Sequence, residues 1–471
     1  MIRKICSVVA LVVVLIVLAA IGVPYIRASL QVQELWRAYD STGGEFSFVA
    51  DCIEQGYSYL EHKENLLGFD WSTVRRAYAE RYGAAEGEEE RSYLIDEMLA
   101  LFDDGHTMFI HDPLTLDKSI GLLLEKRAHG VVIASLSSTL ASLYPELEPG
   151  LLVQHIDGGD IGKMWAKLLA VSGMSLLEKG DAILSQRFFQ TYFFYEARFM
   201  ENPHSVTLGI VTRQGTTQDI ALTWQGAAQV KTTHGIQTKA RSPKVGASGM
   251  MLDEEIGYIK LDSFSTSVTS AKIDSAFSQV SAAKALIIDL RGNGGGSFSK
   301  YGVEVLRHIL SGSTMVGTKE LRLSRFLQLF GDNSGELGKE GGSSGYSRPF
   351  EIVASLKNAG THAGKPVTLL VDETCFSSAD MFIAAFADLG LGDIVGRLNA
   401  LHSGQPLTIE FPDGSTSLQF STIISRGPSG EITEGRAVSI VDVPLTRDEI
   451  LGTRDPILET ALARIANRLS H

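Results

Sequence analysis

The stretch KALIIDLRGNGGG, residues 284–296, indicates how the second half of this chain folds. It begins with an uninterrupted apolar run at 285–288, the pattern of a strand that is buried on both faces of a sheet. Glycines then dominate residues 292–296, and glycine allows tight turns that a Cβ atom would hinder. A helix-like segment follows at 298–312. The stretch therefore predicts a strand, a glycine-rich turn and a helix.

The same alternation continues on both sides of this stretch. Strand-like and helix-like runs succeed one another at residues 256–264, 267–283, 366–372, 377–390, 392–396 and 457–469. Strands that alternate with helices predict an α/β core built on a parallel sheet. We expect residues 251–471 to form this core.

Two differently patterned regions precede the core. Residues 30–112 place apolar side chains at helical spacing, which predicts an N-terminal helical domain. Residues 113–225 contain short apolar runs separated by glycine and proline, which predicts a small β-rich domain. Residues 226–250 are polar and without a period, and we interpret them as a linker.

The first 29 residues carry a targeting signal. Arg3 and Lys4 precede residues 5–23, which contain no charged side chain. This apolar run approaches the ~20 residues that span a bilayer and exceeds the ~7–15 of a signal-peptide core. We interpret residues 1–29 as a signal anchor, with a cleaved signal peptide as the alternative. Both predict that the rest of the chain is extracytoplasmic, either on a single-pass cell-membrane anchor or secreted.

The composition indicates a globular protein and argues against some kinds of binding partner. The 471 residues are 44% hydrophobic and 21% charged, as in a globular protein of more than one domain. A net charge of −13 without a basic block argues against a nucleic-acid partner. The three cysteines, Cys6, Cys52 and Cys375, have no metal-binding spacing, and a Cys52–Cys375 disulfide stays open.

The glycine-rich turn has three possible roles. It could be an ordinary strand–helix turn, a phosphate-binding loop or an oxyanion hole, because glycines let backbone N–H groups face an anion. The spacings typical of dinucleotide- and nucleotide-binding loops are absent.

Two further motifs could take part in catalysis. In DETCFSSADMF, residues 372–382, Ser377 or Ser378 either caps a helix or acts as a nucleophile. In LFDDGHTMF, residues 101–109, His106 could be the base that a hydroxyl nucleophile requires. Each motif alone also has an ordinary structural explanation.

Together, DLRGNGGG, FSSAD and DDGHT resemble the C-terminal processing (tail-specific) serine peptidases, specifically their tricorn-core-like branch. The resemblance covers roughly residues 35–465, and LEPGLLVQHIDG, residues 147–158, is similar to a PDZ-like segment. It implies an α/β catalytic core of ClpP/crotonase-like βα units at 251–471 and a PDZ-like domain at 113–225. It also implies a peptide or protein substrate, and neither a metal nor a cofactor.

The resemblance assigns a role to each matching position. Ser377 matches the nucleophile, and His106 matches the general base. The backbone N–H groups of Ser378 and of Gly295 or Gly296 match the oxyanion hole. Glu434 aligns with an acidic residue that helps to orient the site.

One position departs from the related Ser–Lys dyad enzymes. Their base lysine lies about 25 residues after the serine, where this chain reads LHSG, residues 401–404. No lysine is present there, so His402 is the competing base.

A rival interpretation is a non-catalytic protein on the same fold that binds apolar ligands or peptides, because a fold does not dictate activity. The resemblance extends to retinoid-binding relatives. The combination of Ser377, His106 and the glycine-rich turn favours the enzyme. The oligomeric state stays open.

Overall fold

The computed structural model describes most of the chain from residue 44 to residue 470. The exceptions are residues 111–117, 128–129, 172–180, 182–183, 186–187, 190, 193–195, 197–203, 227–245, 325, 328–344, 359, 399, 412–413, 415, 445–448 and 450–452. Contacts divide the chain into two compact units, residues 1–84 with 320–348, and residues 85–319 with 349–471.

The first unit is helical. It contains α2 (Glu45–Gly56), α3 (Leu60–Leu67) and α4 (Trp71–Ala84). Asp70 caps α4, because its Oδ2 accepts a hydrogen bond of 2.8 Å from the Thr73 N–H. Arg322 returns to these helices and donates to the Tyr57 carbonyl at 2.8 Å.

The second unit begins with α5 (Glu88–Ala100) and includes a β-rich module. The module's main sheet has the order β3 (Leu122–Arg127), β4 (Gly130–Leu136), β5 (Leu152–Ile156), β7 (Ser205–Val211) and β8 (Thr217–Thr223), with β6 (Gly159–Asp160) paired to β5. β2 (Lys118–Ser119) pairs with β9 (Gln225–Gly226), and the helices α6 (Ser138–Leu143) and α7 (Ile161–Leu169) complete the module. Gly215, with φ of +82°, lies in the turn that joins the antiparallel strands β7 and β8.

The largest sheet has six strands. Their order is β10 (Ala247–Met251), β11 (Ile256–Leu261), β12 (Ala285–Asp289), β15 (Val367–Val371), β16 (Gly392–Gly396) and β20 (Val441–Asp442). β10 and β11 are antiparallel, and all other neighbours are parallel. The carboxyl ends of the central strands β12 and β15 therefore meet at one edge, the usual location of ligand sites in such sheets.

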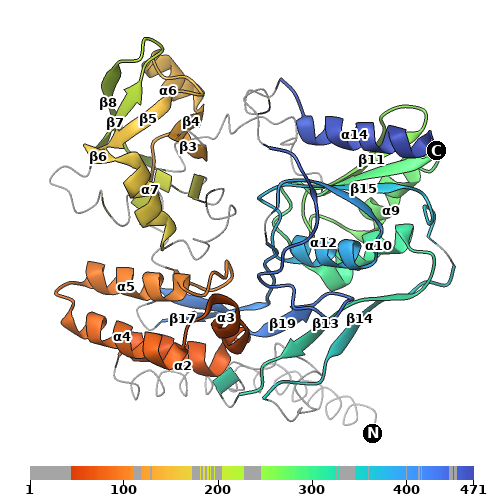
Figure 1. Ribbon diagram of the computed structural model, residues 1–471, viewed down its shortest axis with the longest axis horizontal. Coiled ribbons are helices and arrows are strands. Elements are labelled where there is room, and N and C mark those ends of the chain that lie inside the picture. Colours follow the sequence, from red (N-terminus) through yellow and green to blue (C-terminus); the bar gives the residue numbers. More distant parts are fainter. Residues whose placement is uncertain are drawn as a thin grey trace, which may run out of the picture. The chain divides into compact units, whose positions relative to one another are not determined.

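Helices cover both faces of this sheet (Figure 1). On one face lie α9 (Ser270–Gln279), α10 (Val303–Ile309) and α12 (Ser378–Asp388), and on the other lies α14 (Pro456–Leu469). Within β12, Leu286 and Ile288 join the core under the first three helices, whereas Ala285 and Ile287 join the core under α14. Burial on both faces explains the continuous apolar run, and the predicted mixed α/β class is confirmed.

Two three-stranded sheets flank the core. One has the order β1 (Met108–Ile110), β18 (Ser417–Ser421) and β17 (Pro406–Glu410). The other has the order β14 (Phe350–Ala354), β13 (Thr314–Leu321) and β19 (Ile423–Arg426). A π-helical turn, η2 (Phe298–Gly302), leads into α10. The first of these sheets matters for the site, because β1 directly follows the turn that contains His106.

Cys52 and Cys375 are both buried free thiols, so they form no disulfide. Burial raises the pKa of the Cys52 thiol. The predicted signal anchor, residues 5–23, lies outside the described residues. Among the residues that the structure does describe, no helix has the length and apolar character needed to cross a membrane.

Candidate active site

Ser377 occupies a strained turn between β15 and α12. Its φ of +60° and ψ of −116° are unusual for a residue other than glycine. Such conformations cost ~1–3 kcal/mol and occur preferentially at functional sites. The side chain of Ser377 makes no capping hydrogen bond to α12. The helix-cap explanation therefore does not hold for Ser377.

Ser378 has a different environment from its neighbour. Its Oγ donates to the Gly296 carbonyl at 2.8 Å, which joins the start of α12 to the glycine-rich turn. Its backbone N–H has no hydrogen-bond partner among the described residues. The side chain of Ser378 is thus structural, while its N–H is available to a bound group.

Gly295 lies directly against the serine turn. A Cβ atom on Gly295 would come within 2.7 Å of the Phe376 carbonyl oxygen and 2.8 Å of Ser377 Cβ. Gly295 also has φ of +100°, a conformation that glycine accepts without strain. Its N–H donates to Asn293 Oδ1 at 3.0 Å, whereas no partner of the Gly296 N–H is found among the described residues. The sequence-predicted glycines thus do reach the serine.

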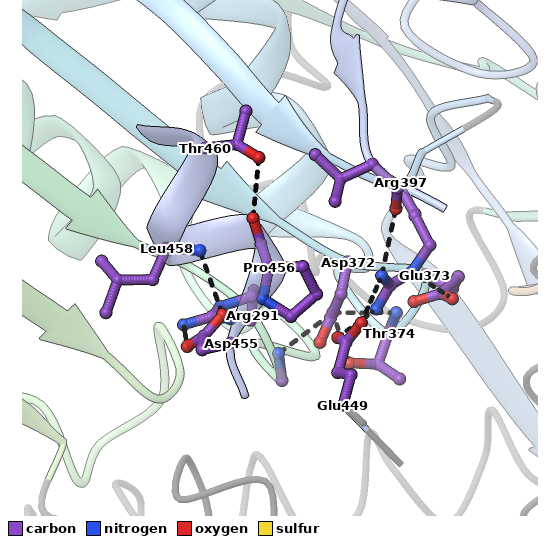
Figure 2. Close-up of polar contacts among 12 residues, drawn as sticks. Arg291, Asp372, Glu373, Thr374, Arg397, Glu449, Asp455, Pro456, Leu458 and Thr460 are labelled. Carbon is purple, nitrogen blue, oxygen red and sulfur yellow. Dashed lines mark hydrogen bonds and ion pairs between the residues drawn. The ribbon is translucent and has the colours of Figure 1, made fainter. Parts of the chain in front are cut away.

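The turn before Ser377 is fixed to the glycine-rich turn, as Figure 2 shows in part. Asp372 Oδ1 accepts hydrogen bonds from the Gly292 N–H at 3.1 Å and from the Thr374 hydroxyl at 2.7 Å. The Phe376 N–H donates to the Asn293 carbonyl at 3.1 Å. These bonds hold the strained serine conformation in place.

A buried ion cluster anchors the end of β12. Arg291 pairs with Asp289 at 2.7 Å. It also pairs with Asp455, at the start of α14, at 2.7 Å (Figure 2). Burial alone would raise the pKa of Asp289, but the charges of Arg291 and Lys260 hold it well below its usual range. Both partners therefore stay ionised, and Arg291 ties the glycine-rich turn to the opposite face of the sheet.

A second ion cluster lies beside the serine turn. Arg397, which follows β16, donates to Glu373 and to Glu449, in each case at 2.8 Å (Figure 2). Burial raises the pKa of Glu373 despite the opposing charge of Arg397. Glu373, which precedes Ser377 in the turn, is thus held by a charged pair.

His106 also lies next to the serine turn. Its ring stacks on Phe376, the residue before Ser377, with centroids 4.4 Å apart and an interplanar angle of 20°. Gln419 Nε2 donates to the His106 carbonyl at 3.2 Å and thereby joins the turn to β18. Only 4% of His106 is exposed, and its Nδ1 is buried without a hydrogen-bond partner.

His402 reaches the same aromatic ring from another loop. Its ring centroid is 6.1 Å from that of Phe376. His402 Nδ1 is 3.1 Å from Glu434 Oε1, and its backbone N–H donates to Asp380 Oδ2 at 2.8 Å. The residue is fully buried, and its Nε2 has no hydrogen-bond partner.

The structure therefore gathers the sequence-predicted residues around one serine. Phe376, the residue before Ser377, contacts the rings of both histidines, and Gly295 lies against Ser377 itself. The sequence assigns no role to Asn293, whose Oδ1 accepts from the Gly295 N–H, or to Asp104, whose Oδ1 accepts from the His106 N–H. Asn293 lies in DLRGNGGG and Asp104 in DDGHT, so their position inside these two motifs is the sequence signal that could have identified them.

The chain is similar to known proteins in sequence profile and in fold. Residues 255–439 match the sequence profile of Peptidase family S41. None of the curated proteins matches the chain in a sequence comparison.

Solved structures of CPAF share the fold. A crystal structure of mature CPAF is 16% identical, with a TM-score of 0.67, and the match covers 94% of this chain and 98% of that one. Mature CPAF complexed with lactacystin is 15% identical, with a TM-score of 0.66, and the match covers 94% of this chain and 100% of that one. For the photosystem II D1 C-terminal processing protease, the identity is 18% and the TM-score 0.44, and the match covers 88% of this chain and 97% of that one.

The family match contains the glycine-rich turn, the serine turn and the His402–Glu434 pair, and the CPAF structures show the same fold over nearly the whole chain. Residues 255–439 therefore form a domain of peptidase family S41, and the chain that carries it is a serine-type peptidase.

Proposed function

We propose that this chain is an extracytoplasmic serine peptidase that hydrolyses peptide bonds in proteins or peptides, with Ser377 as nucleophile and His106 as general base. The observation that carries the proposal is the geometry of Ser377. A strained backbone, a side chain that caps no helix and a glycine packed against its Cβ are features of a presented nucleophile.

The proposed reaction follows the general scheme of serine hydrolysis. Ser377 Oγ attacks the peptide carbonyl carbon while His106 Nε2 takes the hydroxyl proton, and a tetrahedral oxyanion forms. His106 then protonates the leaving amine, which yields an acyl-enzyme. Water attacks this ester with His106 again as base, and releases the carboxylic acid and Ser377.

Backbone N–H groups would stabilise the oxyanion. The Ser378 N–H is one donor, and the second comes from Gly295 or Gly296. In the present structure the Gly295 N–H is engaged by Asn293 Oδ1, so it would have to leave that bond to serve the oxyanion. The Gly296 N–H needs no such change. One such donor contributes about 10²–10³-fold in rate.

The parts around the core would handle the substrate. We assign the β-rich module at 118–226 as PDZ-like, so that a peptide terminus adds as a strand to the free edge of a sheet. Within the part of the chain that the structure describes, β3 is a terminal strand of the module's main sheet and offers such an edge. The core would consist of ClpP/crotonase-like βα units.

The proposed location rests on the N-terminal sequence. The uncharged run at 5–23 after Arg3 and Lys4 would hold the chain in the membrane as a signal anchor, or direct its secretion if it is cleaved.

A fluorophosphonate probe tests the proposed function directly. Such probes phosphonylate activated serines, so we expect one covalent adduct per chain, on Ser377, together with cleavage of an unstructured peptide. Peptide mapping by mass spectrometry locates the adduct. An unlabelled protein that binds an apolar ligand tightly would instead favour the non-catalytic rival.

Replacing Gly295 by alanine should impair catalysis. The added Cβ would come within 2.8 Å of Ser377 Cβ, so the serine or the turn must shift. A displacement of about 1 Å can lower a rate about 10²-fold, and we expect at least that loss in kcat.

Gly294→Ala is the matched control for this change. A Cβ on Gly294 meets nothing within 4 Å, and Gly294 is not among the glycines with positive φ. This variant should keep kcat within a few-fold of wild type. Equal losses in the two variants would show that Gly295 has no special role.

A further inference from the structure

We propose that Asp104 is the carboxylate that positions His106 and stabilises its protonated ring, an inference that rests on the proposed role of His106 as the base. The two residues share one tight turn between α5 and β1. Asp104 would act through His106 and not on the substrate, so it is a positioning residue.

Hydrogen bonds fix the orientation of Asp104. The carboxylate is fully buried. Its Oδ1 accepts from the His106 N–H at 2.9 Å, and its Oδ2 accepts from the hydroxyls of Thr107 at 2.8 Å and Ser421 at 3.0 Å. Ser421 belongs to β18, so the carboxylate is held by its own turn and by the neighbouring strand. A side chain fixed in this way offers His106 a preorganised acceptor.

The ring of His106 has one nitrogen that requires such an acceptor. Its Nδ1 is buried, lacks a hydrogen-bond partner and lies 3.7 Å from Asp104 Oδ1. When Nε2 takes the proton of Ser377, both ring nitrogens carry hydrogen, and the ring becomes a cation. A small rotation of the ring would bring the Nδ1–H within hydrogen-bond distance of Asp104. A carboxylate in that place holds the tautomer and stabilises the imidazolium.

Glu434, the acid that the sequence resemblance suggested, serves a different histidine. Its Oε1 is 3.1 Å from His402 Nδ1, and its Oε2 accepts from the Ser403 N–H at 2.7 Å. Both partners lie in the loop after β16. Glu434 therefore orients that loop, and the carboxylate that lies 3.7 Å from His106 Nδ1 comes from the same turn as His106 itself.

Several other titratable groups surround His106 and bear on any pH measurement. Asp103 precedes Asp104 in the turn and is buried. His402 contacts Phe376, on which His106 stacks, and is bonded to Glu434 and Asp380. A test must therefore separate Asp104 from the His402–Glu434 pair.

The test is the rate of fluorophosphonate labelling of Ser377 as a function of pH, in wild type and in Asp104→Asn. Asparagine keeps the size of the side chain and an oxygen for the His106 N–H, but it removes the charge. We expect labelling to be at least 100-fold slower at neutral pH. The acid limb of the profile, where the rate falls as the base becomes protonated, should move to lower pH, because loss of the anion makes the ring harder to protonate.

Two control variants distinguish charge from structure. Ser421→Ala removes one donor to Asp104 but leaves the charge, so it should lower Tm without moving the acid limb. Glu434→Gln should also leave the limb in place. The inference is overturned if Asp104→Asn labels like wild type, or if Glu434→Gln moves the limb instead. Absence of labelling in wild type would refute the proposed function and this inference with it.

Discussion

Ser377→Ala should abolish peptide hydrolysis while leaving the protein folded. Removing the nucleophile of a serine protease lowers kcat about 10⁶-fold, and we expect a loss of that order here. Ser377 Oγ makes no hydrogen bond with any described residue, so its removal should not lower Tm. Steady-state kinetics on an unstructured peptide and a thermal melt measure the two quantities. Substrate affinity should stay close to that of wild type.

Two neighbouring substitutions sharpen this result. Ser378→Ala removes the hydrogen bond to the Gly296 carbonyl but keeps the backbone N–H, so it should lower stability by about 1 kcal/mol and retain most activity. Ser377→Gly should be as inactive as Ser377→Ala but more stable, because glycine relieves the strain at φ of +60°. A Ser377→Ala protein that cleaved at the wild-type rate would remove Ser377 from the mechanism.

The pattern of apolar residues made the core predictable from the sequence. β12 and β15 are apolar at nearly every position because helices cover both faces of the sheet, and this pattern can be read without a structure. Helix ends are less visible. The spacing of Leu94, Met98 and Leu101 places all three on one apolar face, yet Leu101 is 39% exposed because α5 ends at Ala100.

The site was predictable in part, for a different reason. The serine and the glycines lie in short contiguous motifs, which fix their local geometry. The backbone strain at Ser377 has no local signal, because neighbouring turns impose it. The pairing of His402 with Glu434 joins residues 32 positions apart, and it depends on how two loops meet. Reciprocal backbone bonds, Leu401 N–H to Arg436 O and Gly435 N–H to Leu401 O, make that meeting specific.

His106→Gln should lower kcat at least 10⁴-fold, whereas His402→Gln should lower it about tenfold or less. Glutamine removes the titrating base at either position but keeps a polar side chain, so the two variants are matched. A general base contributes about 10²–10⁴-fold, and loss of the histidine in a serine protease costs more because the group acts as a unit. Kinetics on the peptide substrate of the Ser377→Ala experiment measure both variants.

The environments of the two histidines explain why the first should be the base. His402 is fully buried, and its Nδ1 faces a buried carboxylate, so its replacement should mainly reduce stability. The ring centroid of His106 lies 4.4 Å from that of Phe376, the residue before Ser377, whereas the corresponding distance for His402 is 6.1 Å. Of the two ring nitrogens of His106, only Nδ1 is buried without a hydrogen-bond partner. Added imidazole should therefore restore some activity to His106→Ala and none to His402→Ala. If His402→Gln lost activity while His106→Gln kept it, the base would be His402, with Glu434 as its orienting acid.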